Sequence, residues 1–452
     1  MDRVALIGEN SVEYINMLLD IWNCGNSAVL IDWKTPFLTA LEMMKEANVK
    51  QCIIEKRLIE YKDISSVQGI EFVVFERKDN FAQCLPYDTY DKFQSNYEKN
   101  EAVIVYSSGI TGKPKGVILS HYAINTNADT IIDYMHLKNY DCIYIANTIS
   151  HSSTLTGELL VALKTRTKLV IAPTVVPSRF VLNNIEIYKV SIICVNPTLL
   201  DMYADEVSRN KYILTSLKTI YVCGSILNDR IYNKAHDVFK DTIIYNVYGL
   251  SEAGQLLTIH REDCCNDNSV GKANKNVEIV IVNKQGKRVK NGERGIIHVK
   301  TKFLYSGYVA RTDGSKSLYK GWLNTGDIGF FDEYGELHIV DRIDDVATID
   351  SHIIYPADIE NKILLNCKVK DCVVLIVNCN EENLLCCLYT AETDLTQHIK
   401  TSLSTIVMQY EIPKLFIRVD CIPRSRNGKV MKREIGKFEI NKHLRLLGKC
   451  NN

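Results

Sequence analysis

Short apolar runs alternate with amphipathic segments along the first half of the chain. The runs VALIG, SAVLI and QCIIE are typical of buried strands, and the segments between them are typical of helices. The segment SVEYINMLLDIWNCG puts its apolar residues on one helical face, with Ser11 able to cap the start and Gly25 beyond the end. This alternation predicts a mainly parallel sheet covered by helices.

The same pattern recurs further along the chain, in AVIVYSS, KLVIAP, SIICVNP, TIYVCG and IIYNVYG. Each of these expected strands ends in a polar or glycine-bearing turn. Because ligands of open α/β sheets bind at the carboxyl ends of strands, we expect several of these turns to converge on one site.

The pattern changes after about residue 276. The segments VEIVIV, GIIHVK and GELHIVDR are separated by glycine turns and predict a β-rich subdomain. From residue 343 a new series of helices and strands begins, with PADIENKILLN and DLTQHIKTSLSTIV as helices. We place a domain boundary near Asp344, where the absence of a flexible linker favours a tight hinge.

Composition narrows the classes of function. The 452 residues are 46% apolar and 24% charged, which is ordinary for a globular protein and excludes disorder or a fibre. Lys plus Arg equals Asp plus Glu at 54 each, so no overall field favours nucleic acid or an anionic membrane. The start, MDRVALIGEN, fits neither a signal peptide nor a membrane span, so we expect a cytoplasmic protein. The 15 cysteines form no C-x-x-C pair and predict reduced, mostly buried thiols.

The first stretch whose residue types suggest a binding site is YSSGITGKPKGV, residues 106–117. Backbone N–H groups freed by glycine, hydroxyl groups and ammonium groups all bind phosphate oxygens. The stretch is not a Walker loop, because Pro114 follows Lys113 where a magnesium-binding Ser or Thr is required. A plain surface loop is the alternative interpretation of the same composition.

Four further motifs follow in order: YGLSE at 248–252, WLNTGD at 322–327, DRIDD at 341–345 and PRSRNGKVMKRE at 423–434. With the glycine loop, this set resembles the adenylate-forming superfamily of acyl- and aryl-CoA ligases, luciferases and peptide-synthetase adenylation domains. The resemblance implies an α/β fold. Its large N-terminal domain, 1–343, would hold helix-covered sheets plus a β-barrel-like subdomain, and 344–452 would be a small mobile α+β C-terminal domain.

The resemblance also implies a reaction. A carboxylic acid and ATP would form an acyl- or aryl-adenylate with release of pyrophosphate. The acyl group would then pass to the thiol of CoA or of a carrier protein's phosphopantetheine.

Nucleotide contacts are implied at the matching positions. The triphosphate loop would comprise Ser107, Ser108, Gly109, Thr111, Gly112 and Lys115. Ile110 replaces the usual hydroxyl residue, a loss of about 1–2 kcal/mol if one hydrogen bond is missing. Gly224 and Ser225 match an adenine-edge segment, Asp327 would accept the ribose hydroxyls, and Arg342 would touch ribose or phosphate.

The motif YGLSE implies four more contacts. Tyr248 would offer its ring to adenine, with Gly249 beside it, and Ser251 would offer its hydroxyl to the α-phosphate. Glu252 would be an oxygen ligand of Mg²⁺.

The C-terminal domain would supply Lys429, a mobile lysine that bridges the attacking carboxylate and the α-phosphate. A pre-placed donor of this kind is commonly worth on the order of 100- to 1,000-fold in rate. Asp344 would be the hinge about which this domain rotates between the two half-reactions. The neighbouring Lys432 and Arg433 are expected to be solvated helix charges.

Two positions depart from the pattern in the loop after the hinge. Thr348 stands where many relatives have a lysine, and Ser351 where they have a glycine close to the pantetheine tunnel. The first half-reaction is unaffected by these changes, whereas standard CoA transfer is placed in question.

The stretch ISHSSTLTGELL, 149–160, matches the segment that lines the acyl pocket. His151 falls at a gate beside the reacting carboxylate, although it could equally be an ordinary polar residue. Ser152 replaces the aspartate that pairs the ammonium group in amino-acid-activating relatives, and an unpaired buried ammonium is costly. We therefore expect a small-molecule aryl or acyl acid and a free-standing ligase that loads CoA or a separate carrier protein. An amino-acid adenylation enzyme, a luciferase-like oxygenase and a catalytically impaired nucleotide-binding homologue are the alternatives.

Overall fold

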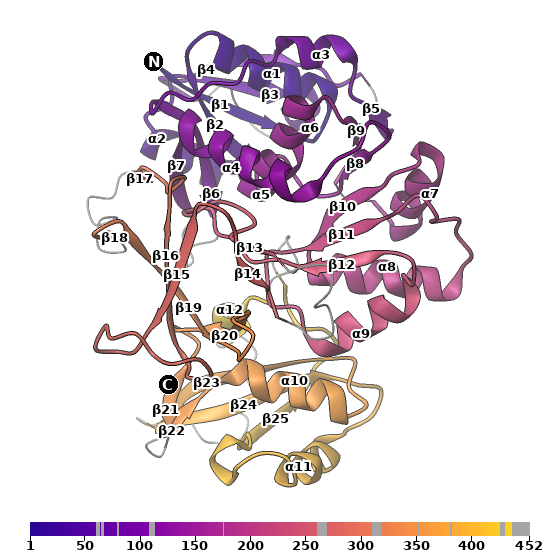
Figure 1. Ribbon diagram of the computed structural model, residues 1–452, viewed down its shortest axis with the longest axis vertical. Coiled ribbons are helices and arrows are strands. Elements are labelled where there is room, and N and C mark those ends of the chain that lie inside the picture. Colours follow the sequence, from indigo (N-terminus) through magenta and orange to yellow (C-terminus); the bar gives the residue numbers. More distant parts are fainter. Residues whose placement is uncertain are drawn as a thin grey trace.

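The computed structural model describes residues 1–59, 64, 67–78, 81–107, 114–174, 176–259, 269–309, 318–349, 352–379, 382–424 and 430–435. Figure 1 shows two helix-covered sheets and a β-rich sheet in an N-terminal unit, β1 to β20, with a smaller C-terminal unit, β21 to α12, beneath it. The predicted α/β fold class is confirmed.

The first sheet has seven strands in the order β17-β7-β6-β2-β1-β3-β4. Its strands are β1 (Arg3–Gly8), β2 (Ser27–Asp32), β3 (Gln51–Glu55), β4 (Glu71–Phe75), β6 (Glu101–Ser107), β7 (Lys115–Ser120) and β17 (Gly307–Tyr308). Pairing is parallel from β6 to β4 and antiparallel at β7 and β17. On one side the sheet therefore contains the hairpin of β6 and β7, with the short strand β17 at its edge.

Helices cover both faces of this sheet. Helix α1 (Val12–Asn23) has the predicted cap, because the Ser11 hydroxyl accepts from the Tyr14 N–H, and Gly25 beyond its end has φ 73°. Leu6 faces α1, and its neighbours Ala5 and Ile7 face α2 on the opposite side. The remaining elements around this sheet are η1 (Lys56–Leu58), α2 (Phe37–Glu46), α3 (Tyr87–Lys92) and α4 (His121–Met135).

The second sheet has the order β12-β11-β10-β8-β9-β5 and is parallel except at β5. Its strands are β5 (Gln83–Cys84), β8 (Cys142–Ile145), β9 (Lys168–Ile171), β10 (Ile192–Val195), β11 (Thr219–Val222) and β12 (Ile243–Asn246). Its helices are α5 (Ser152–Thr154), the π-helical turn η2 (Leu155–Leu159), α6 (Leu160–Thr165), α7 (Ser178–Tyr188), α8 (Pro197–Arg209) and α9 (Asp229–Val238).

The predicted β-rich subdomain is a five-stranded antiparallel sheet with a short two-stranded sheet beside it. The larger one contains β15 (Val277–Val282), β16 (Gly295–Thr301), β18 (Leu318–Tyr319), β19 (Trp322–Phe331) and β20 (Leu337–Arg342). The smaller one contains β13 (Thr258–Ile259) and β14 (Lys272–Ala273).

The C-terminal unit has its own apolar core, which includes Ile359, Val374 and Cys387. Its strands are β21 (Ala347–Ile349), β22 (His352–Ile354), β23 (Asp371–Cys379), β24 (Glu382–Thr390) and β25 (Leu415–Arg418). Its helices are α10 (Pro356–Asn366), α11 (Thr396–Ser404), η4 (Gln409–Glu411) and α12 (Lys432–Ile435). Helix α10 has the predicted bounds, and α11 is shorter than its predicted segment.

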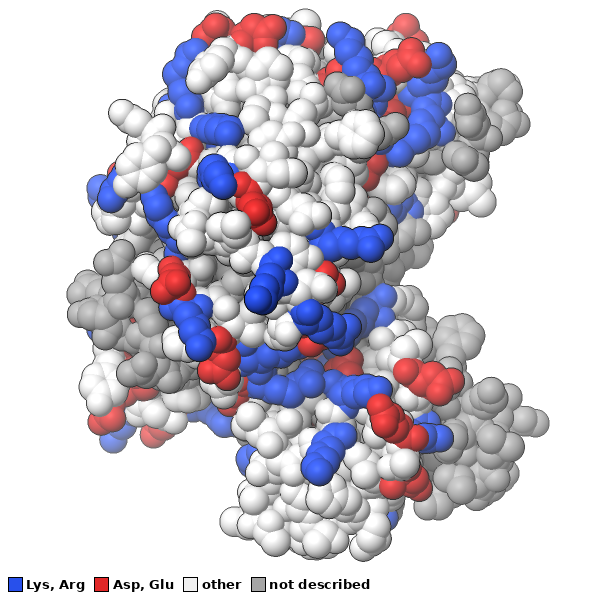
Figure 2. Space-filling model, turned by 90° about the vertical axis from the view of Figure 1, so that its right-hand side faces the viewer, with Lys and Arg blue, Asp and Glu red and all other residues white. Residues whose placement is uncertain are grey.

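None of the helices in the described ranges is long and apolar enough to cross a membrane. Eleven of the cysteines in these ranges carry free thiols. On the face shown in Figure 2, Lys and Arg side chains lie among Asp and Glu side chains, and a row of Lys and Arg crosses the face where the two units adjoin.

Candidate active site

The predicted phosphate loop is the turn between β6 and β7. Ser107 ends β6 and pairs with Lys115, the first residue of β7, so both ends of the loop are held by one hairpin. The loop itself lies outside the described residues, and with it the predicted contacts Ser108, Gly109, Thr111 and Gly112 and the departure at Ile110.

Tyr308 connects this hairpin to the motif YGLSE. Its strand, β17, pairs with β7, and its hydroxyl donates to Glu252 Oε1 at 2.8 Å. Lys115 Nζ lies 5.5 Å from the centre of the Tyr308 ring. Burial, and then the Glu252 carboxylate, raise the pKa of Tyr308, so this hydroxyl remains a proton donor. Tyr308 belongs to none of the recognised motifs, and the sequence analysis missed it.

Ser251 connects YGLSE to the expected acyl-pocket segment. Its hydroxyl lies 2.8 Å from the Ser152 hydroxyl at the start of α5. Gln255 also donates from Nε2 to Ser152 Oγ at 3.0 Å. A bridge between Leu250 and Gly254 closes the turn that presents Ser251. Two segments about 100 residues apart in sequence thus meet at a pair of hydroxyl groups.

Asp327 and Arg342 lie opposite each other on β19 and β20. The Tyr248 hydroxyl donates to Asp327 Oδ2 at 2.5 Å, and Arg342 Nη1 donates to Asp327 Oδ1 at 2.5 Å. Burial, and then the charge of Asp327, raise the pKa of Tyr248. Burial lowers the pKa of Arg342, but the charge of Asp327 and its hydrogen bond raise that pKa by more, so the pKa of Arg342 lies above its ordinary value. Three predicted nucleotide contacts therefore form one network, in which Tyr248 and Asp327 are buried and Arg342 is partly exposed.

The second adenine-edge segment lies at the carboxyl end of β11. Gly224 and Ser225 are exposed there, and the Val247 N–H donates to Val222 O at 2.9 Å, so the start of the YGLSE motif runs beside them. Gly249 is tightly packed, because a Cβ at this position would lie 2.9 Å from a side-chain oxygen. At Gly224 nothing lies within 4 Å of a built Cβ, so the backbone there is open to close approach by a ligand.

His151 precedes Ser152 and is the N-cap residue of α5. Burial lowers the pKa of its imidazole; Asp32 raises that pKa and Lys34 lowers it, each to a smaller extent. The side chain is therefore neutral at neutral pH. Its suggested place beside a reacting carboxylate stays a prediction, because burial lowers the pKa of an ordinary buried histidine in the same way.

Glu158 is a buried acid that the sequence analysis missed. It lies in η2 with 1% of its surface exposed, and its Oε2 has no hydrogen-bond partner in the described part of the chain. Burial raises the pKa of Glu158 well above its ordinary value, and the Thr154 hydroxyl opposes this rise. Burial, followed by Glu158, also raises the pKa values of the thiols of Cys194 and Cys223. The only sequence signal is a lone acid in the apolar run TLTGELLVAL.

Lys429 and Ser351 lie outside the described residues, whereas the residues around them are placed. Asp344 is exposed in the turn between β20 and β21, and Thr348 is exposed in β21. A bridge between Arg424 and Val430 closes the segment that contains Lys429.

The prediction that Lys432 is a solvated charge is wrong. Only 19% of its side chain is exposed, and its Nζ lies 3.3 Å from Glu360 Oε1 and 3.8 Å from Asp345 Oδ2. The error arose because the partners come from α10 and from the turn after β20, which are distant in sequence. The side chain of Arg433 lies outside the described part of the chain.

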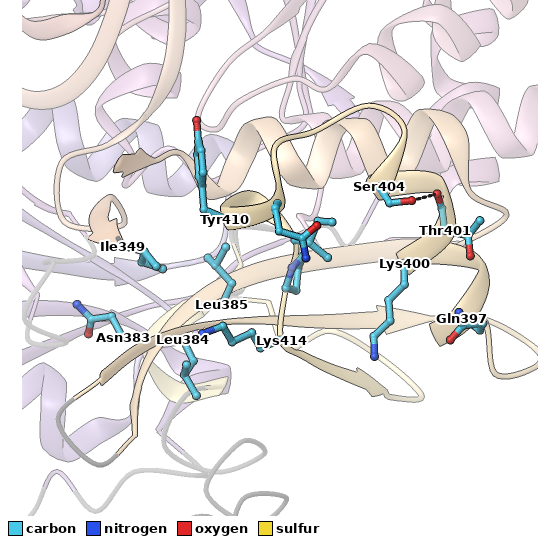
Figure 3. A pocket seen from close by; sticks show the side chains of 13 residues that line it. Ile349, Asn383, Leu384, Leu385, Gln397, Lys400, Thr401, Ser404, Tyr410 and Lys414 are labelled. Atoms are coloured by element: carbon cyan, nitrogen blue, oxygen red, sulfur yellow. Dashed lines mark hydrogen bonds between the residues drawn. The ribbon is translucent and has the colours of Figure 1, made fainter. Parts of the chain in front are cut away.

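A cavity of about 710 Å³ lies in the C-terminal unit, between α11, β24 and the segment 409–414 (Figure 3). Lys400 and Lys414 lie among its lining residues, together with apolar side chains such as Leu384 and Leu385. None of the predicted site residues lines it, so we do not count it as part of the candidate active site.

The chain matches the family model described as AMP-binding enzyme over residues 1–309. It is similar to 4-coumarate-CoA ligase 1 of Narcissus pseudonarcissus, with 24% identity over 99% of this chain and 85% of that protein. It is also similar to 4-coumarate--CoA ligase 1 of Petroselinum crispum, with 25% identity over 96% of this chain and 84% of that protein.

Solved structures share the fold. ATP-bound MatB from Rhodopseudomonas palustris matches with a TM-score of 0.85 and 21% identity, over 96% of this chain and 88% of that one. The anthranilate CoA ligase AuaEII in complex with anthranoyl-AMP matches with a TM-score of 0.82 and 19% identity, over 99% and 88%. MenE from Bacillus subtilis in complex with ATP and magnesium ion matches with a TM-score of 0.81 and 20% identity, over 96% and 89%.

Proposed function

The chain belongs to the family of AMP-binding enzymes, and from this premise we propose that it is an ATP-dependent acid–thiol ligase. It joins a carboxylic acid to AMP with release of pyrophosphate, and then transfers the acyl group to the thiol of CoA. The observation that carries this proposal is the convergence of separate motifs through Tyr308, Ser152 and Asp327.

ATP lies across the ends of the phosphate hairpin and the buried pair on β19 and β20. Ser107 and Lys115 hold the β- and γ-phosphates together with the loop between them. The ribose hydroxyls donate to Asp327, whose carboxylate has about four lone-pair sites and therefore accepts more than the two bonds it already receives. Arg342 contacts ribose or phosphate, and the Tyr248 ring borders adenine.

Glu252 fits a magnesium site. Mg²⁺ is usually held by one or two carboxylates together with substrate phosphates and water, and Glu252 offers a hard oxygen beside the phosphate hairpin. The bound ion would neutralise charge on the triphosphate. Tyr308 orients the Glu252 carboxylate, since its hydroxyl donates to one of the two oxygens.

In the first half-reaction a carboxylate oxygen forms a bond to the α-phosphorus of ATP. The bond from that phosphorus to the bridging oxygen breaks, and pyrophosphate leaves with the electron pair. Ser251 donates to an α-phosphate oxygen, and Lys429 bridges that phosphate and the attacking carboxylate. Neutral His151 borders the acid without forming an ion pair that would weaken the nucleophile.

In the second half-reaction a thiolate attacks the acyl carbon of the adenylate. The bond from that carbon to the AMP oxygen breaks, AMP leaves, and a thioester forms. The acceptor is CoA or, as a finer proposal, the phosphopantetheine of a separate carrier protein. Rotation of residues 344–452 about Asp344 would exchange Lys429 for the loop after the hinge.

The acid substrate is an aryl acid. The curated relatives are 4-coumarate-CoA ligases, and one structural neighbour holds anthranoyl-AMP. Position 152 carries a serine hydroxyl, which contacts Ser251 and Gln255, and not a carboxylate. The α-amino group of an amino-acid substrate would therefore have no counter-ion at this position. Amino-acid activation is therefore disfavoured.

The test is pyrophosphate–ATP exchange with a panel of benzoates, cinnamates, fatty acids and amino acids. We expect magnesium-dependent exchange with at least one aryl acid, followed by thioester formation when CoA is added. Exchange confined to amino acids would contradict the substrate class. If a thioester forms only with a carrier protein, the carrier protein replaces CoA as the proposed acceptor. If the protein binds ATP but no acid supports exchange, the proposed ligase activity is contradicted.

A further inference from the structure

The segment 305–309 lies along the phosphate hairpin as an added edge strand. Within it, β17 pairs with β7 in an antiparallel ladder. The backbone N–H groups of Ser306 and Val309 donate to carbonyl oxygens of β7 at 2.8 and 2.9 Å, the second of them that of Gly116. Because Gly116 directly follows Lys115 in the chain, the segment is fixed to the backbone that presents this lysine.

The contact between this segment and the hairpin is tight. A Cβ built at Gly116 would lie 2.9 Å from Val309 Cγ2 and 3.2 Å from two side-chain atoms of β6. Val309 is itself buried. Glycine at position 116 therefore lets segment 305–309 lie this close to the hairpin, and close packing holds it in one place.

The same segment holds Glu252 at two points. The Tyr305 N–H donates to Glu252 O at 2.8 Å, and the Tyr308 hydroxyl donates to Glu252 Oε1 at 2.8 Å. The rings of Tyr305 and Tyr308 meet edge to face, with their centres 5.0 Å apart, and this contact favours one direction of the Tyr308 ring. The backbone and the carboxylate of Glu252 are thus both positioned from segment 305–309.

Tyr308 contacts two opposite charges with different parts of its side chain. Its ring lies 5.5 Å from Lys115 Nζ, a distance at which the face of an aromatic ring attracts an ammonium group. Its hydroxyl binds one oxygen of Glu252, which directs the other oxygen, Oε2, to a further partner. Mg²⁺ demands near-ideal octahedral geometry, so the orientation of a carboxylate ligand affects how tightly the ion is bound.

We propose that Tyr308 is a positioning residue for both charges that meet a magnesium-bound triphosphate. Its hydroxyl orients Glu252 so that Oε2 binds the metal, and its ring holds Lys115 at the phosphate hairpin. This inference rests on the proposed function and deepens it, because it assumes that Glu252 binds Mg²⁺ and that Lys115 binds phosphate. The two roles can be separated, since phenylalanine keeps the ring and lacks the hydroxyl.

The test is the affinity for ATP, measured by calorimetry without an acid substrate, once with magnesium and once with EDTA. Tyr308→Phe should weaken binding with magnesium about tenfold, within the usual loss for a residue that supports a metal ligand, and leave binding in EDTA unchanged. Tyr308→Leu and Tyr308→Met should in addition weaken binding in EDTA about two- to fivefold, because Lys115 no longer lies over a ring. Two variants that remove the ring are compared so that the result does not depend on how either side chain packs.

Tyr319→Phe is the matched control. Tyr319 is 69% exposed, and Lys320 Nζ lies 5.2 Å from the centre of its ring. This variant should bind ATP as wild type does under both conditions. In a chain that carries Glu252→Gln, Tyr308→Phe should cause no further loss, because both substitutions act on the same ligand of the metal.

Equal losses with magnesium and with EDTA in Tyr308→Phe would overturn the positioning of Glu252, since the damage would then not concern the metal. Unchanged binding in EDTA for Tyr308→Leu and Tyr308→Met would overturn the role of the ring toward Lys115. If wild type binds no ATP under either condition, the proposed function itself fails. If wild type binds ATP with magnesium and Tyr308→Phe binds it equally well, only the role of the Tyr308 hydroxyl is refuted.

Discussion

Asp327, Glu252 and Glu158 are three acids of one region in three different environments. Asp327 is paired with Arg342, and Glu252 accepts from Tyr308, so each has a donor that suits a carboxylate. Glu158 has no counter-charge among the described residues near it, and burial keeps it protonated. The first two are therefore suited to bind cations or donors, and Glu158 is suited to act as a neutral group.

We predict that Glu158→Gln raises stability, and more so at high pH. The folded-state pKa of Glu158 lies above the ordinary value of 4.5, so the folded chain keeps a proton that the unfolded chain releases. The stability that this proton contributes is fully present below pH 4.5, the ordinary pKa. It is lost as pH rises toward the folded-state pKa, and the free energy of unfolding falls by up to about 1.4 kcal/mol per pH unit. Glutamine, which has no proton to lose, removes this slope.

Urea unfolding of wild type and variant between about pH 5 and pH 8 measures this difference. Glu278→Gln on the exposed face of β15 is the control and should leave the pH dependence of unfolding unchanged. If Glu158→Gln and wild type keep the same pH slope, Glu158 is ionised in the folded chain and this assignment is wrong.

At the scale of elements, the turn after β12 presents two proposed ligands and depends on Gly254. This residue has φ 91°, and a Cβ there would meet the Phe303 ring and lie 3.0 Å from Asn127 Cγ. The turn therefore needs glycine for its backbone conformation and for space. The conformation of this turn determines where Ser251 and Glu252 lie.

We predict that Gly254→Ala destabilises the chain by about 2–5 kcal/mol, the sum of a left-handed backbone penalty and overpacking. Gly286→Ala is the matched control, since Gly286 has φ 75° and nothing within 4 Å of a built Cβ. The control should lose only about 1–2 kcal/mol. Similar losses in both variants, measured by chemical denaturation, would show that the Phe303 contact is unimportant.

The elements that local patterns define were predictable. Ser11 and Gly25 mark the two ends of α1, and Pro356 starts α10 at the predicted residue. Contacts across long sequence separations were not predictable. Tyr308 meets Glu252 through a two-residue strand with no local signature, and Asp341 caps a helix that begins 15 residues later in another unit.

For the site, the motifs named Tyr248, Asp327 and Arg342 as separate nucleotide contacts, and the structure joins the three in one network that the motifs did not predict. Their roles toward the nucleotide stay predictions. Lys432 was misjudged because its partners, Glu360 and Asp345, are distant from it in sequence. Whether a charge is solvated is settled by tertiary contacts, which a pattern of three charged residues at a helix start does not contain.

At the scale of the whole molecule, two units with separate cores meet at α10 and at the turn between β20 and β21. Asp344 lies exposed in that turn, next to Asp345, whose carboxylate faces Lys432. A joint between two separate cores can rotate without breaking either core. This arrangement suits an enzyme whose two half-reactions use different poses.

We predict that Asp344→Pro slows one half-reaction more than the other, since proline fixes φ and removes an N–H at the proposed hinge. Asp344→Ala, which keeps the backbone free, should retain most of both rates. Pyrophosphate exchange and thiolysis of supplied adenylate measure the two steps separately. Unchanged rates of both steps in Asp344→Pro would refute the hinge.

The most direct test of the account is the rate of adenylate formation in wild type and in Lys429→Ala, measured by pyrophosphate exchange with saturating ATP, magnesium and the best aryl acid. The account predicts a loss on the order of 100- to 1,000-fold in the variant, with thiolysis of supplied acyl-adenylate retained. Equal rates of exchange in the two proteins, or equal loss of both half-reactions, would contradict it.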